Sequence, residues 1–165
     1  MQKISPFLWF DDNAEEAAKF YTSVFKNAKI NKITRYPEGP AEQIGREPGS
    51  VMTVEFTLDG VEFVALNAGP QFKFTEAVSF AVTCDTQEEV DYYWEKLTAD
   101  GGEPGDCSWL KDKYGLSWQV QPGLLIELLG DSDKAKAERV MSAMMKMSKI
   151  DIAALKEAAA GATEG

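Results

Sequence analysis

The expected secondary-structure elements occur in the same order twice along the chain, and this repeat limits the folds open to it. The first half contains a strand, a helix and three strands, at 4–10, 14–25, 29–36, 51–58 and 61–67. The second half contains a strand, a helix and two short strands, at 78–83, 87–102, 103–110 and 116–120. A repeated element order indicates two copies of one supersecondary unit. The sequence therefore predicts two βαβββ modules.

Residues 51–58 give the clearest strand signal, because apolar and polar side chains alternate along them. The alternation places four apolar side chains on one face, Met52, Val54, Phe56 and Leu58. Asp59-Gly60 is a signal for a two-residue hairpin turn, so we expect 61–67 to pair with 51–58. We expect Asp12 or Asn13 to cap the first helix, and Asp85 or Thr86 to cap the second.

The chain from Asp131 onward is expected to be helical, with Asp151 as the cap of a last helix. Its apolar residues recur at helical spacing as a stripe of Val140, Met144, Met147, Ile152 and Leu155. Because exposed strand edges and apolar stripes are usually covered, we expect a homodimer whose contact uses strand edges and this tail. The alternative is that the tail folds back over its own sheet and buries its stripe within one chain.

Charge and composition narrow the choice of partners and compartment. The net charge of −10 repels nucleic acid, and no basic stripe is present. The apolar runs are too short for a membrane span, and two cysteines do not make a disulfide framework. We therefore expect a cytoplasmic protein with no nucleic-acid or membrane partner.

The chain contains no histidine. This excludes Ser-His-Asp and Cys-His nucleophiles, histidine general bases and histidine-containing metal sites. Any catalysis would have to use carboxylates, Lys, Tyr, Cys or a bound cofactor, so we assign no catalytic residue and expect no cofactor.

Three segments carry a resemblance to a known family: ISPFLWFDDNAEEAAKFYTSVF (4–25), VEFVALNAGPQFKFTEAVSF (61–80) and SWLKDKYGLSWQVQP (108–122). They resemble the PhnB-like branch of the vicinal-oxygen-chelate (glyoxalase, bleomycin-resistance and dioxygenase) superfamily. The resemblance implies an α+β fold in which two βαβββ modules form a glyoxalase-like half-open barrel around a cleft. We expect the modules at 1–69 and 70–130, followed by a helical C-terminal tail at 131–165.

Proteins with these segments are often labelled 3-demethylubiquinone-9 3-methyltransferase. The sequence does not favour methyl transfer, because no glycine-rich loop follows the first strand as it does in a Rossmann-like donor site.

The resemblance also implies positions at which metal-dependent members hold an ion, one His, Glu or Gln on each of four strands. The matching positions in this sequence are Ser5 or Pro6, Ala65 or Asn67, Ser79, and Gln119. Only Gln119 is of a type that the family uses, so we expect no metal site here.

Strand parity and the resemblance together give a set of residues expected to face the cleft and bind a ligand. The set is Ser5, Phe7, Trp9, Phe63, Asn67, Ser79, Trp109 and Gln119. Aromatic rings with a few neutral hydrogen-bonding groups suit a planar or apolar small molecule. The alternative is that Phe7, Trp9 and Trp109 fill the barrel and leave no cavity.

Two functions from different classes stay open. The first is a binding protein whose metal-free cleft sequesters or senses a small aromatic or amphipathic compound. The second is an enzyme of the superfamily (a lyase, dioxygenase or transferase) that acts on such a compound, with Gln119 assisting a weakly held ion or with no metal. The absence of histidine favours the binding protein.

We predict that protein purified without a chelator carries no stoichiometric transition metal in its cleft. The physical reason is that hydroxyl and carbonyl oxygens alone bind such metals weakly. Elemental analysis measures this directly. One Zn, Ni, Mn or Fe per chain, with Gln119 coordinated, contradicts the prediction.

Overall fold

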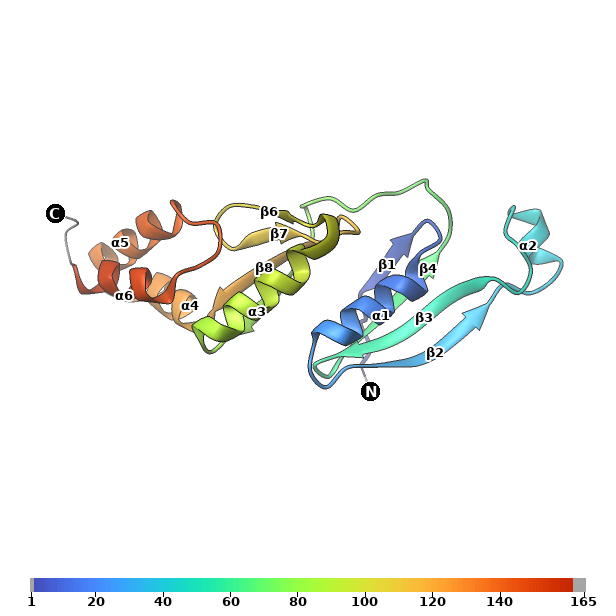
Figure 1. Ribbon diagram of the computed structural model, residues 1–165, viewed down its shortest axis with the longest axis horizontal. Coiled ribbons are helices and arrows are strands. Elements are labelled where there is room, and N and C mark those ends of the chain that lie inside the picture. Colours follow the sequence, from blue (N-terminus) through green and yellow to red (C-terminus); the bar gives the residue numbers. More distant parts are fainter. Residues whose placement is uncertain (1, 162–165) are drawn as a thin grey trace. The chain divides into compact units, whose positions relative to one another are not determined.

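The computed structural model describes residues 2–161 and divides the chain into two compact units, Met1–Phe74 and Thr75–Gly165 (Figure 1). Each unit contains its own four-stranded sheet with parallel and antiparallel pairs. The predicted α+β fold with two βαβββ modules is confirmed. The sheets are separate, and the division after Phe74 lies beyond the module boundary expected at 69.

The first unit contains β1 (Phe7–Phe10), α1 (Ala14–Val24), β2 (Lys29–Arg35), α2 (Pro40–Gln43), β3 (Val51–Leu58) and β4 (Val61–Asn67). Its strands lie in the order β1-β4-β3-β2. β1 runs parallel to β4, and the other neighbours are antiparallel. The short helix α2 lies in the connection between β2 and β3.

The core of the first unit lies between α1 and one face of this sheet, across which α1 is seen in Figure 1. The ring of Tyr21 on α1 stacks on Phe56 with centroids 6.1 Å apart, and Phe56 stacks on Phe63 at 5.4 Å. Leu8 and Phe10 of β1 are buried on the same side. Burying such side chains contributes about 1.5–3 kcal/mol each, so this one layer accounts for much of the unit's stability.

The β3–β4 hairpin fixes which side chains reach that core. Asp59 and Gly60 have φ angles of 46° and 81°, both in the left-handed region that a type I′ turn requires. The turn places Leu58 opposite Val61 and therefore Phe56 opposite Phe63. The hairpin predicted from Asp59-Gly60 is confirmed.

The second unit contains β5 (Ser79–Cys84), α3 (Gln87–Thr98), the 3₁₀ turn η1 (Ala99–Gly101), β6 (Glu103–Pro104), β7 (Trp109–Lys111) and β8 (Ser117–Pro122). Its strands lie in the order β5-β8-β7-β6, the counterpart of the first sheet. The single strand predicted at 103–110 is wrong, because the loop 105–108 separates β6 from β7. Thr86 caps α3, since its side chain accepts from Glu89 N at 3.2 Å.

Three helices follow the second sheet: α4 (Gly123–Leu129), α5 (Lys134–Met144) and α6 (Ile152–Ala160). We call these helices and their connections the C-terminal tail. The sequence predicted α5, α6 and the Asp151 cap, which accepts from Ala154 N at 3.1 Å, but not α4. Among residues 2–161, no helix has the length and apolar character needed to cross a membrane.

The tail buries most of its apolar stripe in a core made by its own helices. Its core consists of Leu125, Leu128, Val140, Ile150 and Leu155, with Met144 and Met147 packed against it. Val140 and Leu155 are fully buried, so these two residues of the stripe are not available to a partner subunit. The homodimer through strand edges and the tail stays a prediction.

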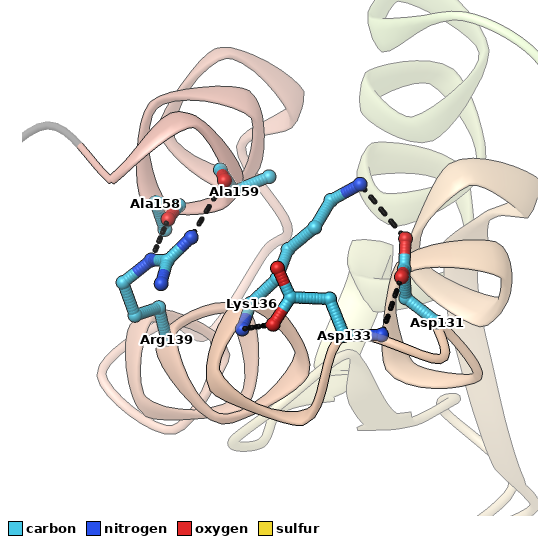
Figure 2. A network of polar contacts seen from close by, with 6 residues as sticks. All are labelled: Asp131, Asp133, Lys136, Arg139, Ala158 and Ala159. Carbon is cyan, nitrogen blue, oxygen red and sulfur yellow. Dashed lines mark hydrogen bonds and ion pairs between the residues drawn. The ribbon is translucent and has the colours of Figure 1, made fainter.

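Polar contacts hold the tail helices together around this core (Figure 2). Arg139 on α5 donates from Nε to Ala158 O and from Nη2 to Ala159 O, both at 2.9 Å, at the C-terminus of α6. Lys136 pairs with Asp131 at 2.8 Å, and Asp133 caps α5. A cation at a helix C-terminus satisfies carbonyls that have no partner within the helix.

We predict that Leu155→Ala lowers the free energy of unfolding by about 2–5 kcal/mol, the usual cost of deleting a buried leucine side chain. Met145→Ala is the matched control on the same bundle, because Met145 is 63% exposed. We expect it to change stability by less than about 0.5 kcal/mol. Urea denaturation followed by circular dichroism measures both, and equal losses would show that the tail core does not support the fold.

Candidate functional site

The face of the first sheet opposite α1 carries exposed aromatic side chains. Phe7 and Trp9 of β1 lie on this open face, because Leu8 and Phe10, which alternate with them, are buried on the side of α1. Phe7 is 59% exposed. Trp9 donates from Nε1 to Gly69 O at 2.9 Å and meets the ring of Phe72 edge-on, with centroids 4.8 Å apart. We call Phe7, Trp9 and Phe72 the aromatic strip.

A polar hollow of about 600 Å³ lies on the same unit beside the strip. Its polar lining includes Ser5, Lys29, Asn31, Glu55, Thr57 and Glu62. Val64 also lines it and is the register partner of Phe7, so the hollow and the strip are contiguous. Asn31 donates from Nδ2 to Thr57 Oγ1 at 2.8 Å, which orients both polar groups.

The open face of the second sheet brings together three of the predicted ligand-binding residues. Gln119 on β8 donates from Nε2 to Ser79 Oγ on β5 at 3.0 Å. Trp109 on β7 lies opposite Gln119 in the register, so its ring is on the same face. All three side chains are half-buried. This face therefore offers one ring and one neutral hydrogen-bonding pair.

Ser117 lies next to this group on the open face, where strand parity also places it. It sits on β8 between Ser79 and Lys111 in the register. Its side chain is 1% exposed, and its Oγ has no hydrogen-bond partner among the described residues.

Lys111 pairs with Glu76, and this hydrogen bond lowers the pKa of the Glu76 carboxyl. Both partners are largely exposed, so solvent weakens the pair.

Asp112 is a further residue that sequence reasoning missed, and it organises the turn between β7 and β8. Its Oδ1 accepts from Tyr114 N at 2.8 Å and from Leu116 N at 3.1 Å, and its Oδ2 accepts from Trp118 Nε1 at 2.9 Å. An Asp that binds backbone N–H groups two residues on is the signature of an Asx turn, so the string DKYG held the signal. Through this turn Asp112 positions the strands that carry Trp109 and Gln119.

The expected placement of Phe63 and Asn67 on the cleft side is wrong. The register pairs Leu8 with Ala65 and Phe10 with Asn67, so these residues of β4 share the helix-covered face. The ligand positions that the resemblance implies put these β4 side chains on the cleft side. The register of the β3–β4 hairpin puts them on the opposite face. The two-residue turn at Asp59-Gly60 contained the missing signal, because it sets Phe63 opposite Phe56.

Asn67 has a structural role on that face. It is 4% exposed, and its Oδ1 accepts from Ala14 N, the first residue of α1, at 2.8 Å. Its Nδ2 donates to Val51 O at 3.2 Å. Asn13 stands at the N-cap of α1 but makes no side-chain capping bond, so Asn67 supplies the acceptor from another strand.

The residues present do not fit the metal of the superfamily. On β4, the side chains that share the open face are those of Glu62, Val64 and Leu66, while Ala65 and Asn67 point to the helix side. Ser79 and Gln119 offer only neutral oxygens, which hold transition metals weakly. Within residues 2–161, no three Cys, Asp or Glu side chains gather as ion ligands.

Cys84 adds no nucleophile to these faces. Burial raises the pKa of the Cys84 thiol to about 12, so the group is a neutral core residue near pH 7. Cys107 is half-buried in the loop between β6 and β7.

The family model for 3-demethylubiquinone-9 3-methyltransferase matches residues 2–121. The chain belongs to this family. The match ends within β8, so the C-terminal tail lies outside the part that defines the family. A search of curated proteins gave no significant match.

Solved structures confirm the PhnB-like resemblance. The PhnB protein from Bacillus cereus, which carries the same family description, is 41% identical with a TM-score of 0.64. The match covers 74% of this chain and 100% of that chain, so the rest of this chain has no counterpart there.

More distant solved structures share the fold alone. Protein PA1353 from Pseudomonas aeruginosa is 18% identical with a TM-score of 0.58, over 74% of this chain and 98% of that chain. The fosfomycin resistance protein FosX from Mesorhizobium loti is 14% identical with a TM-score of 0.53, over 79% of this chain and 100% of that chain. The family core is thus a glyoxalase-like fold.

We predict that Asn67→Ala lowers the free energy of unfolding by about 1–2 kcal/mol, because Ala14 N loses its acceptor at a helix start. Asn67→Asp keeps an acceptor there and should lose less. Guanidinium denaturation compares the two variants. Equal losses would show that the contact with α1 is not the stabilising one.

Proposed function

We propose that this member of the 3-demethylubiquinone-9 3-methyltransferase family binds a small aromatic or amphipathic molecule on the open face of its first sheet. The observation that supports it is the aromatic strip next to the polar hollow. Small-molecule sites are concave surfaces lined by aromatic side chains with a few placed polar groups. Strip and hollow together meet that description within one unit.

The strip supplies the apolar half of the site. Phe72 is 65% exposed and Phe7 59%, although both are large apolar side chains. Rings that meet edge-to-face leave a corner against which a planar molecule stacks, and such contacts add about 0.5–1.5 kcal/mol each beyond area burial. The Trp9–Gly69 hydrogen bond holds the indole in place, so little side-chain entropy is lost on binding.

The charges of the hollow favour one kind of polar group. Its lining includes the carboxylates Glu55 and Glu62 against the single ammonium of Lys29. The chain as a whole carries a net charge of −10, which attracts cations and repels anions. The ligand we propose is therefore flat and apolar at one end, with a neutral or positively charged group at the other.

The second unit offers a similar combination on its own open face. Trp109 supplies a ring, and the Gln119–Ser79 pair supplies an amide and a hydroxyl. These groups suit a neutral polar aromatic molecule. The expectation that Trp9 and Gln119 line one pocket stays a prediction.

Binding, rather than catalysis, is the function that these side chains support. The chain has no histidine, and the donor set does not fit the superfamily's metal. Chemical conversion of a bound compound during a binding screen would favour the enzyme alternative instead.

A thermal-shift screen of aryl amines, phenols and aryl carboxylates tests the proposal, followed by calorimetry on the best compound. We expect aryl amines and phenols to stabilise the protein more than aryl carboxylates do. Trp9→Ala should weaken binding by more than about fivefold, above the roughly 1 kcal/mol of a generic contact. Tyr92→Ala is the control, because Tyr92 is an exposed aromatic residue on α3. Unchanged affinity in Trp9→Ala overturns the proposal.

A further inference from the structure

The loop between β6 and β7 has an uncommon backbone conformation. Cys107 and Ser108 are consecutive residues with φ angles of 55° and 81°, in the left-handed region. A residue other than glycine pays for this conformation in free energy, so it persists only where the surrounding contacts fix it. The loop lies directly before Trp109, the first residue of β7.

The C-terminal tail supplies those contacts through two consecutive residues. Cys107 N donates to Met147 O at 2.9 Å, and Ser108 N donates to Ser148 O at 3.0 Å. Ser148 also donates from Oγ to Gly105 O in the same loop. The backbone N–H groups of both left-handed residues are therefore bonded to the tail.

The segment that makes these contacts is itself fixed against α3. Gln87 donates from Nε2 to Ile150 O at 3.0 Å and accepts from Ile152 N through Oε1 at 2.8 Å. Lys149 pairs with Asp91 at 2.8 Å, and Ile150 is buried in the tail core. The tail segment that contacts the loop 105–108 is thus itself bonded to α3.

We propose that the C-terminal tail is a positioning element for Trp109. Ser108 O accepts from Val120 N at 2.9 Å, and Trp109 O accepts from Gly105 N at 2.8 Å, so the loop conformation sets where β7 begins against β8. That start places Trp109 opposite Gln119 on the open face. The family match ends at residue 121, so the tail residues that make these contacts lie outside the matched part of the chain.

The inference rests on the proposed function in one respect only, namely that Trp109 contributes to ligand binding. The contact and its effect on Trp109 are measured without any ligand. If the protein binds no small molecule but Ser148→Ala changes hydrogen exchange in the loop and the Trp109 resonance as expected, only the proposed function is refuted. If the protein binds a small molecule but Ser148→Ala leaves loop exchange and the Trp109 resonance unchanged, only the role of the tail is refuted.

Ser148→Ala removes the hydroxyl that binds Gly105 O, and Ser142→Ala is the matched control, an exposed serine on α5 of the same tail. Amide hydrogen exchange is measured at Cys107 and Ser108. We expect roughly tenfold faster exchange in Ser148→Ala, the effect of losing one net hydrogen bond, and no change in Ser142→Ala. Thermal unfolding checks that each variant is folded.

Repeating Ser148→Ala in the Cys107→Gly variant distinguishes a specific effect on the loop conformation from a general loss of structure in the loop. In Cys107→Gly the backbone adopts the left-handed conformation without help, because glycine has no Cβ. We therefore expect Ser148→Ala to speed exchange by less than about threefold in that background. An effect of the same size with and without Cys107→Gly overturns the proposal.

The third measurement reads Trp109 itself. With 5-fluorotryptophan incorporated, the fluorine resonance of Trp109 is assigned by its absence in Trp109→Phe. We expect Ser148→Ala to shift or broaden this resonance and to leave that of Trp9, in the first unit, unchanged. An unchanged Trp109 resonance, or equal changes at both residues, overturns the positioning role.

Discussion

One-sided burial of each sheet is the constraint on which the rest of the structure depends. In the first unit, Val54, Phe56 and Phe63 are buried on the side of α1, and in the second, Leu110, Trp118 and Val120 are buried on the side of α3. Because side chains of a strand alternate between faces, burial of one face commits every second residue to the other. This alternation explains why four candidate ligand-binding residues lie on the open faces: Phe7, Trp9, Trp109 and Gln119.

The sequence predicted those elements whose local signals agree with their tertiary surroundings. The alternation along 51–58 and the Asp59-Gly60 turn both point to the structure that forms. The helix α4 was missed because it follows Pro122 directly and has no side-chain cap. The break between β6 and β7 was missed because contacts with Met147 and Ser148, far along the chain, fix the loop 105–108.

The candidate site was predictable where it depends on strand parity alone and not where it depends on register between strands. Ser79 and Gln119 were placed on one face correctly, and the structure joins them by a hydrogen bond. Phe63 and Asn67 were misplaced by one residue of parity, and such a shift moves a whole strand to the opposite face. Phe72 lay outside every expected element, so no periodicity indicated that its ring meets Trp9.

The tail differs from the family core in the kind of interaction that attaches it. Its buried apolar side chains form a core of its own, and hydrogen bonds to backbone groups and one ion pair join it to α3 and to the loop 105–108. Apolar packing is non-directional and tolerates sliding, but a backbone hydrogen bond weakens steeply with distance and angle. An attachment through Gln87, Met147 and Ser148 therefore fixes geometry as well as adding stability. A helical bundle that served only to cover a sheet end would not need contacts of this directional kind.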